Sequence, residues 1–324
     1  MKIMKILRGN LGKLCALAVA LVLPQLLTNN YQLTLLCQVV INSIIVIGLN
    51  FIVGLTGQMT LGTAGTFAMG AYTSTLISMK LGVSPWVGLL GAIVMGAIIG
   101  ITLGYPSLRV RGVYLSLTTI GFSEIVRILL TNLSGLTGGA LGVSRIPPFT
   151  LFNYAFKSNR SVYYLYLAMA IVLIALAYRI VYSKWGRAFK SIKDNPDAVE
   201  AVGLNISSLK IMAFTFASIY CCIAGAMYAH YIAFINPSVY NLEFSINYVV
   251  MLIIGGLGSV PGCIAGAALV TLVPEFLRFM ENYYWFVFSV ITLLFVIFLP
   301  NGIASLFRKK GQRKDVRNGY RVKA

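Results

Sequence analysis

Long apolar runs follow one another along almost the whole chain, separated by short polar or glycine-rich segments. A membrane-crossing helix needs about 20 mostly apolar residues, so this pattern predicts a polytopic helical bundle. A transmembrane barrel would instead show short segments of sustained alternation between apolar and polar residues, and the chain has none. The predicted spans lie at about 14–28, 33–53, 62–79, 84–104, 112–131, 161–182, 211–233, 243–257, 262–279 and 283–300.

The predicted fold class is therefore an all-α integral membrane protein of about ten transmembrane spans. Eight or nine spans remain open, because the shorter helices could cross only half of the bilayer. Composition points the same way: of 324 residues, 58% are hydrophobic and only 10% are charged, whereas soluble domains carry about 25% charged residues.

Charge is distributed as expected for a membrane protein with both termini in the cytoplasm. The net charge is +18, and basic residues cluster in the first 13 positions, in the segment 184–210 and in the tail 308–323. Basic clusters that flank apolar spans follow the positive-inside rule, and no nucleic-acid-binding module accompanies them, so we expect no nucleic-acid partner. We expect an uncleaved first helix, one permease domain over residues 1–307 with a cytoplasmic loop at 183–210, and a basic cytoplasmic tail over 308–324 that contacts anionic lipid.

Candidate catalytic groups are few. The chain has one histidine, His230, and five cysteines in or beside apolar segments, with no CxxC pair. A metal site needs several ligands at fixed spacing, and an enzyme needs a nucleophile–base pair or a metal cluster. We therefore expect no metal, no cofactor and no enzymatic activity in this chain.

The stretch GLTGQMTLGTAG (54–65) interrupts two apolar runs. It lacks the Gly-Lys-Ser/Thr of a phosphate-binding loop, and no strand precedes it, so it predicts a helix break or tight turn on the cytoplasmic side. Gln58 and the threonines can satisfy the backbone groups that the break leaves free. Other glycines predict close helix packing or a turn. The glycines assigned to packing or breaks are Gly54, Gly57, Gly62, Gly65, Gly96, Gly100, Gly255, Gly256 and Gly258.

The segment SKWGRAFKSIKDNPDAVEAVGLN (183–205) is the only sizeable internal hydrophilic stretch. Asn195 and Pro196 predict the start of a short helix of about two turns, and Gly203 predicts its end. Small Ala198 and Ala201 leave a face that can enter a groove, which favours docking to a cytoplasmic partner over a plain surface cap. The predicted docking residues are Pro196, Asp197, Ala198, Glu200, Ala201 and Gly203.

Polar residues inside the spans are the candidates for a translocation path. Glu124 and Arg127 share one helix face, and Glu124 lies about 18 Å along its span at 1.5 Å per residue, near the bilayer centre. Two readings stay open for them: a buried ion pair that locks the bundle, or groups that line the path. Asn42 is a further polar candidate. The path candidates are Asn50, Gln58, Glu124, Arg127 and Asn247.

Four motifs in this order carry a resemblance to a known family. GLTGQMTLGTAGTFAMGAY, RGVYLSLTTIGFSEIVRILLTNLSGLTGG, GRAFKSIKDNPDAVEAVGLN and IIGGLGSVPGCIAGA together resemble the LivM-type permeases of branched-chain amino-acid ABC importers, from about residue 40 to 300. By position, 196–203 resembles the coupling loop that such permeases press into their ATPase, with AVEAVG where AAEAMG-like sequences are usual.

The resemblance implies a subunit of a bacterial importer in the cytoplasmic (inner) membrane. It implies a second related permease subunit, two cytoplasmic ATP-binding subunits and an extracytoplasmic substrate-binding protein as partners, with ATP bound by the partner subunits. Branched-chain, hydrophobic amino acids are the implied substrate. Permeases for urea and other amides look similar, and an ion-coupled secondary transporter that uses Glu124 is a further alternative.

Overall fold

The computed structural model describes residues 18, 20–25, 29–110, 112–151, 154–156, 158–277, 284–298 and 302–303. The predicted basic tail, the basic N-terminus and most of the predicted first span lie outside the described residues. Within the described chain, every other predicted apolar run is a helix, with ends that differ from the predicted ones by a few residues.

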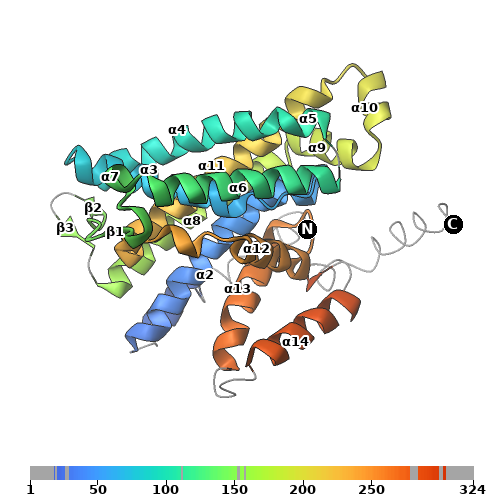
Figure 1. The fold of residues 1–324 in the computed structure, drawn as a ribbon. Helices are drawn as coiled ribbons and strands as arrows, with labels where there is room; N and C mark the ends of the chain where they lie inside the picture. Colours follow the sequence, from blue (N-terminus) through green and yellow to red (C-terminus); the bar gives the residue numbers. More distant parts are fainter. Residues whose placement is uncertain are drawn as a thin grey trace.

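The helices form one bundle with a short hydrophilic pair at one end (Figure 1). In chain order they are α2 (Asn30–Leu49), which continues as the π-helix η1 (Asn50–Thr56), α3 (Thr63–Lys80), α4 (Pro85–Gly104), α5 (Pro106–Arg109), α6 (Val113–Asn132), α7 (Ser134–Thr137), α8 (Asn159–Val181), α9 (Lys184–Asp194), α10 (Pro196–Ala201), α11 (Ile206–Ile232), α12 (Leu242–Gly255), α13 (Val260–Phe276) and α14 (Tyr284–Phe298).

Five of these helical segments are long and apolar enough to cross a membrane by themselves. α12 and α13 are apolar but shorter. The prediction of an all-α membrane protein is confirmed, while the ten spans and the cytoplasmic termini stay predictions. The five long segments are Asn30–Thr56, Pro85–Arg109, Val113–Asn132, Asn159–Val181 and Ile206–Ile232.

The core of the bundle is α11, packed against α3 and α4. Small residues allow this close approach: a Cβ added to Gly100 would lie 2.3 Å from Cα of Thr215, and one added to Gly70 would lie 2.3 Å from Cα of Cys222. Lipid gives no hydrophobic driving force between helices. The close approach of the backbones at these glycines therefore supplies the van der Waals attraction that holds the helices together. α2 also packs against α11, and α13 and α8 pack against α2.

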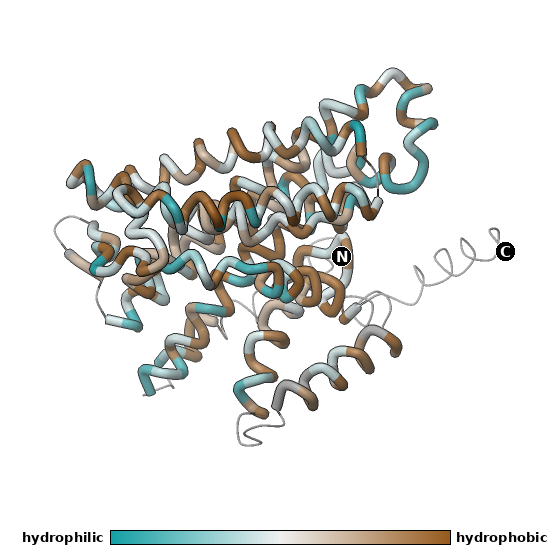
Figure 2. The backbone as a smooth tube through the Cα atoms, viewed as in Figure 1, coloured by the Kyte–Doolittle hydropathy of each residue, from teal (hydrophilic) through white to brown (hydrophobic). Residues whose placement is uncertain are grey.

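The outer side of α4 is an apolar stripe. Its most exposed large side chains recur at helical spacing and are hydrophobic without exception, and the hydroxyl of the neighbouring Thr102 bonds to the carbonyl of Ile98. A surface of this kind suits lipid, which cannot satisfy polar groups. α14 carries a similar stripe and appears brown along much of its length in Figure 2. The stripe on α4 consists of Val87, Leu90, Val94, Ile98 and Ile101.

The two ends of the bundle differ. α5, α9 and α10 lie together at one end, and the segment after α6 folds over the other (Figure 1). That segment contains α7, the short 3-10 helix η2 (Gly139–Leu141) and β1 (Val143–Ser144), which pairs antiparallel with β4 (Phe234–Ile235). β2 (Thr150–Leu151) pairs with β3 (Tyr154–Ala155), and η3 (Pro237–Val239) leads into α12. The described residues between α6 and α8 thus form several short elements.

His230 fastens this end loop to the bundle. Its Nδ1 lies 2.6 Å from the carbonyl oxygen of Pro147, and its Nε2 lies 2.8 Å from Oγ of Ser74. A carbonyl only accepts, so Nδ1–H donates to it, and the neutral ring accepts the Ser74 hydroxyl at Nε2. His230 is therefore a buried residue of α11 that holds the loop and α3 together through two hydrogen bonds.

Candidate functional site

The break predicted at 54–65 is a re-entrant turn inside the bundle. η1 ends at Gly57, whose φ of +72° is the left-handed conformation that glycine adopts without strain. The chain then runs along the first half of α6, where Oγ of Ser116 donates to the carbonyl of Met59, before α3 begins at Thr63. Gln58 is half-buried beside the turn. α3 thus starts within the bundle rather than at its surface.

Side chains from neighbouring helices satisfy the first amides around the start of α3. The amides of Leu61 and Gly65 donate to the hydroxyls of Thr119 and Ser123 on α6. The amide of Ala64 donates to Oγ of Ser245 on α12. A helix start buried without such partners would leave several unpaired donors. α3, α6 and α12 are therefore joined at one point by backbone-to-hydroxyl bonds.

Asn50, a path candidate, and Gly54, a predicted break residue, join the two glycine-rich turns of the chain. Oδ1 of Asn50 accepts the amide of Gly258 at 2.7 Å, and a Cβ at Gly54 would overlap the Asn50 side chain and the Gly258 amide. Gly256 and Gly258 both have positive φ and form the turn between α12 and α13. Nδ2 of Asn50 is buried with no hydrogen-bond partner among the described residues.

Lys193 connects α9 to this same place. Its Nζ donates to the carbonyl oxygen of Gly54 at 3.3 Å, and its stem covers Gly57. A π-helix leaves the backbone carbonyls irregularly placed, and such segments are frequent at functional sites. The geometry links the α9–α10 segment, through Lys193, Gly54 and Asn50, to the turn at Gly258.

The predicted docking helix is α10, and its two ends lie where the sequence predicts them. α10 covers Pro196–Ala201, Oδ1 of Asn195 accepts the amide of Ala198, and Gly203 has φ of +77°. Five of its six residues are exposed, and the sixth, Val199, is 2% exposed and anchors the helix. Exposed apolar side chains continue the same surface at Val202 and Leu204. In Figure 2 teal stretches are frequent along this end of the bundle, with brown positions between them.

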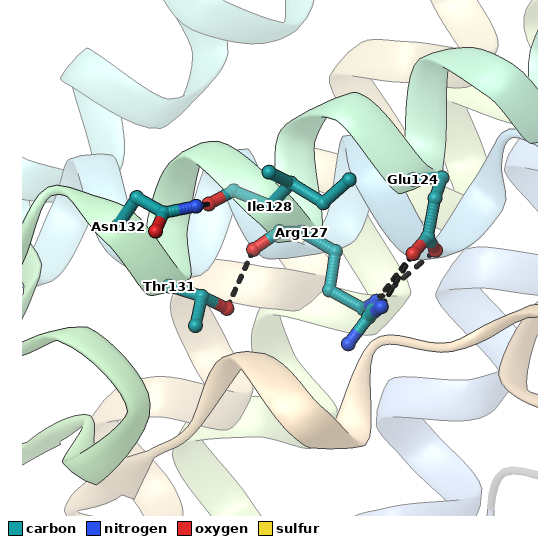
Figure 3. A network of polar contacts seen from close by, with 5 residues as sticks. All are labelled: Glu124, Arg127, Ile128, Thr131 and Asn132. Carbon is teal, nitrogen blue, oxygen red and sulfur yellow. Dashed lines mark hydrogen bonds and ion pairs between the residues drawn. The ribbon is translucent and has the colours of Figure 1, made fainter.

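Glu124 and Arg127 form an ion pair within α6 (Figure 3). Nε of Arg127 donates to both carboxylate oxygens at 3.1 and 3.0 Å, and its terminal nitrogen also bonds to Oε1. Both residues belong to α6, and their side chains are 47% and 34% exposed, so the pair lies at the surface of this chain. Its two predicted roles, an ion pair that locks the bundle or groups that line the path, stay predictions. Sequence position gave their depth along the helix, while the direction that α6 faces decided their exposure.

Asn247 lies apart from this pair. It projects from α12 into a cavity of about 230 Å³ that α2 and α11 complete. A second cavity, of about 20 Å³, lies at the start of α3 beside Thr60, Gly62 and Thr63, which is room for about one water molecule. The structure therefore does not bring the path candidates together: Asn50 and Gln58 lie at the re-entrant turn, the ion pair on α6, and Asn247 on α12.

The remaining predicted glycines lie in helix contacts. A Cβ on Gly62 or Gly65 would press on Thr119 or Ser123 of α6, one on Gly96 would lie 2.7 Å from Cα of Ile219, and one on Gly255 would lie 2.2 Å from the carbonyl of Gly262. No group of three His, Cys, Asp or Glu side chains that could hold a metal ion occurs among the described residues.

Comparison with known proteins identifies the family. The family model "Branched-chain amino acid transport system / permease component" matches residues 31–298. The chain belongs to this permease family.

Relatives within the family agree with this assignment. The chain is 32% identical over 296 residues to the high-affinity branched-chain amino acid transport system permease protein LivM of Salmonella typhimurium, covering 83% of this chain and 70% of that one. It is 24% identical to a probable LivM of Methanocaldococcus jannaschii over 75% of this chain and 76% of that one. It is also 24% identical to LivH of Escherichia coli strain K12, over 81% and 90%. No solved structure matches the chain.

Sequence reasoning did not single out several residues that the structure places at these sites. Lys193, Val199 and Val202 lie in the predicted docking segment, yet only their contacts or exposure distinguish them. The cavity residues Gln38 and Tyr228 were also missed. A polar residue at helical spacing from Asn42, such as Gln38 four positions before it, was the available signal.

Proposed function

We propose that this chain is the membrane-spanning permease subunit of a bacterial ABC importer for branched-chain amino acids in the cytoplasmic (inner) membrane. Family membership supports the permease role, and the names of the LivM and LivH relatives support the substrate. ATP is bound by partner subunits in this proposal, and this chain itself catalyses no reaction.

The observation that carries the proposal is α10. A two-turn helix capped by Asn195, held by one buried side chain and exposed at every other position suits a groove on another protein. We place two cytoplasmic ATP-binding subunits on the assembled importer, one of which docks on α10. An extracytoplasmic substrate-binding protein would then approach the opposite end, where α7 and the β-strands lie.

The exposed ion pair supports a second, related permease subunit against α6. A charged residue at the centre of a membrane helix costs about 2.5–3.5 kcal/mol on insertion scales. α4 has no charged residue, whereas α6 partly exposes Glu124 and Arg127 among apolar side chains such as Leu117 and Ile125. The α6 face therefore suits a partner subunit and a water-containing path better than lipid, and the translocation path would run between the two permeases.

An ion-coupled transporter is less well supported. Such a transporter needs a carboxylate that binds and releases a cation, and Arg127 already engages both oxygens of Glu124. The urea and amide alternative concerns the substrate only and is decided by uptake.

The test is co-purification of the tagged chain from mild detergent, followed by mass spectrometry. We expect two ATP-binding subunits and a second permease with the wild type, and loss of the ATP-binding subunits with Ala201→Arg. Ala140→Arg is the matched control, because Ala140 is equally an exposed alanine but lies at the other end of the bundle. A wild-type chain that purifies alone or as a homo-oligomer would refute the importer assignment. Uptake of leucine but not urea by the assembled complex would identify the substrate class.

A further inference from the structure

The larger of the two cavities described above lies between α2 and α12, and Tyr228 of α11 completes its lining. Its volume is about 230 Å³. An engineered protein cavity of about 150 Å³ accepts benzene, so this one has room for a molecule the size of a small amino acid. The family match and the relatives' names assign no residue to it.

Each of the two helices contributes one continuous face. On α12 the lining residues are spaced at i, i+3, i+4 and i+7 from Phe244, and on α2 they are spaced at i, i+3 and i+4 from Gln38. Residues at these spacings share one side of a helix. The cavity is therefore a gap between two facing helix surfaces, and any shift of α12 relative to α2 changes its width.

The polar side chains that line the cavity are uncharged. Three amide side chains, Gln38, Asn42 and Asn247, and two tyrosines, Tyr228 and Tyr248, line it. An amide offers two N–H donors and a carbonyl acceptor, and a phenol offers one of each. No charged side chain is among the lining residues.

Hydrogen bonds within the fold hold one of the three amides, Asn42, but not the other two. The Tyr248 hydroxyl donates to Oδ1 of Asn42, and Nδ2 of Asn42 donates to Oγ1 of Thr271, both at 2.9 Å, which fixes this amide in place. Gln38 and Asn247 make no side-chain hydrogen bond to another described residue, and both are half-buried at the cavity. Half-buried amides without internal partners are available to a ligand.

Apolar side chains lie on the same two helix faces, between these polar groups. They are Ile41 on α2 and Phe244 and Met251 on α12, and the ring of Phe244 packs against those of Tyr240 and Tyr248. Ligand sites typically combine such an apolar surface with a few placed polar groups. A solute that fills this cavity must therefore be amphipathic, with an aliphatic part and a hydrogen-bonding part.

We propose that this cavity is a substrate subsite, and that it takes a zwitterionic amino acid with an aliphatic side chain. The inference rests on the proposed function and names the residues that contact the substrate. The carbonyls of Gln38 and Asn247 accept from the ammonium group, their N–H groups and the Tyr228 hydroxyl donate to the carboxylate, and the apolar side chains of the lining receive the side chain. Neutral partners suit a solute without net charge and hold it weakly enough to release it, as transport requires. Urea would leave the apolar side chains of the lining without a partner.

The position of α12 connects this subsite to the docking end. α12 ends at Gly255, and the turn that follows is held by the bond from Gly258 to Asn50. The carbonyl of Gly54, one turn further along η1, receives Lys193 of α9. A movement of α9 and α10 would thus displace the C-terminal end of α12 and change the width of the cavity.

The first experiment locates the substrate directly. The complete importer is reconstituted in proteoliposomes, supplied with ATP and with a leucine analogue that carries a diazirine in its side chain, and irradiated during uptake. We expect mass spectrometry to find the label on α2 and α12 peptides that line the cavity. Uptake with labels confined to other helices would overturn the inference alone. Absence of leucine uptake by the wild-type assembly would overturn the proposed function and the inference with it.

The second experiment removes the amides. Gln38→Leu and Asn247→Leu approximately keep side-chain size and break no internal hydrogen bond, so we expect folding and subunit assembly to persist. A hydrogen bond to a charged group contributes about 1.5–3 kcal/mol, so leucine uptake should fall about tenfold or more in each variant. Asn30→Leu, at the exposed start of α2, is the matched control and should transport normally. Unchanged uptake in both cavity variants would overturn the inference.

Discussion

Single side chains in this protein owe their roles to what faces them rather than to their type. Glu124 and Arg127 sit near the middle of a membrane helix, as their sequence position indicates, but they project outward from the described chain. Asn50 is fully buried and holds a distant turn, while Asn247 faces a cavity. These four polar residues of the predicted spans thus act as a surface ion pair, a structural bridge and part of a cavity lining.

The ion pair allows a prediction at this scale. Arg127→Met leaves the Glu124 carboxylate unpaired in a membrane helix, which is expected to be far more damaging than removal of both charges, because an uncompensated charge costs more than a neutral pair. We expect leucine uptake and recovery of the second permease subunit to fall sharply in Arg127→Met and to recover substantially in the double variant Glu124→Gln/Arg127→Met.

A double-mutant cycle on uptake measures this coupling. Strictly additive losses in the two single variants and the double variant would show that the two groups act independently, contrary to the ion pair seen in Figure 3.

Glycines form close contacts between helices in this bundle. α4 meets α11 through Gly96, Gly100 and Gly104, each of which brings a Cβ position within about 3 Å of α11 atoms. α3 meets α11 at Gly70 and Gly225 in the same way. By contrast, Gly121 on α6 has open space around its Cβ position. The same residue type therefore marks a closed interface on α4 and an unoccupied face on α6.

This difference makes an element-scale prediction. Gly100→Leu must push α4 away from Thr215, and overpacking of a tight contact costs about 1–3 kcal/mol or more, so we expect a clearly lower thermal unfolding temperature of the purified chain in detergent. Gly121→Leu should leave that temperature nearly unchanged, because nothing lies within 4 Å of the new Cβ. Equal destabilisation by both substitutions would contradict the packing described for α4 and α11.

One route through the molecule joins the end that carries α10 to the cavity. α9 packs on η1, η1 holds the turn after α12 through Asn50, and α12 borders the cavity with α2. η1 is a π-helix, and π-helical turns are frequent at functional sites. This route is where a movement imposed on α10 would enter the bundle.

Lys193 tests this route. Lys193→Met removes a charge-assisted hydrogen bond to the Gly54 carbonyl but leaves α10 in place, so we expect the ATP-binding subunits to co-purify normally while ATP-driven uptake falls about tenfold. The comparison variant is Lys190→Met, one turn earlier on α9, where the side chain is exposed and no bond to η1 occurs. Loss of the ATP-binding subunits in Lys193→Met would show that the residue serves docking instead of transmission.

Much of this protein follows from the sequence by itself, because the relevant forces act over short distances along the chain. Hydrophobic runs predict the helices, and Asn195, Pro196 and Gly203 predict both ends of α10, since caps and left-handed glycines depend on the nearest few residues. The order of the four glycine-rich and polar motifs predicts the permease family. None of these inferences needs to know which helices touch.

The rest depends on contacts between residues far apart in the sequence, and only the tertiary structure decides them. The bond from Asn50 to Gly258 and the bond from Lys193 to Gly54 each join segments more than a hundred residues apart. The outward direction of Glu124 depends on which side of α6 packs on α3. The cavity exists only because the face of α2 that carries Gln38 lies opposite the face of α12 that carries Asn247. Periodicity determines that each helix has such a face, and packing determines what that face meets.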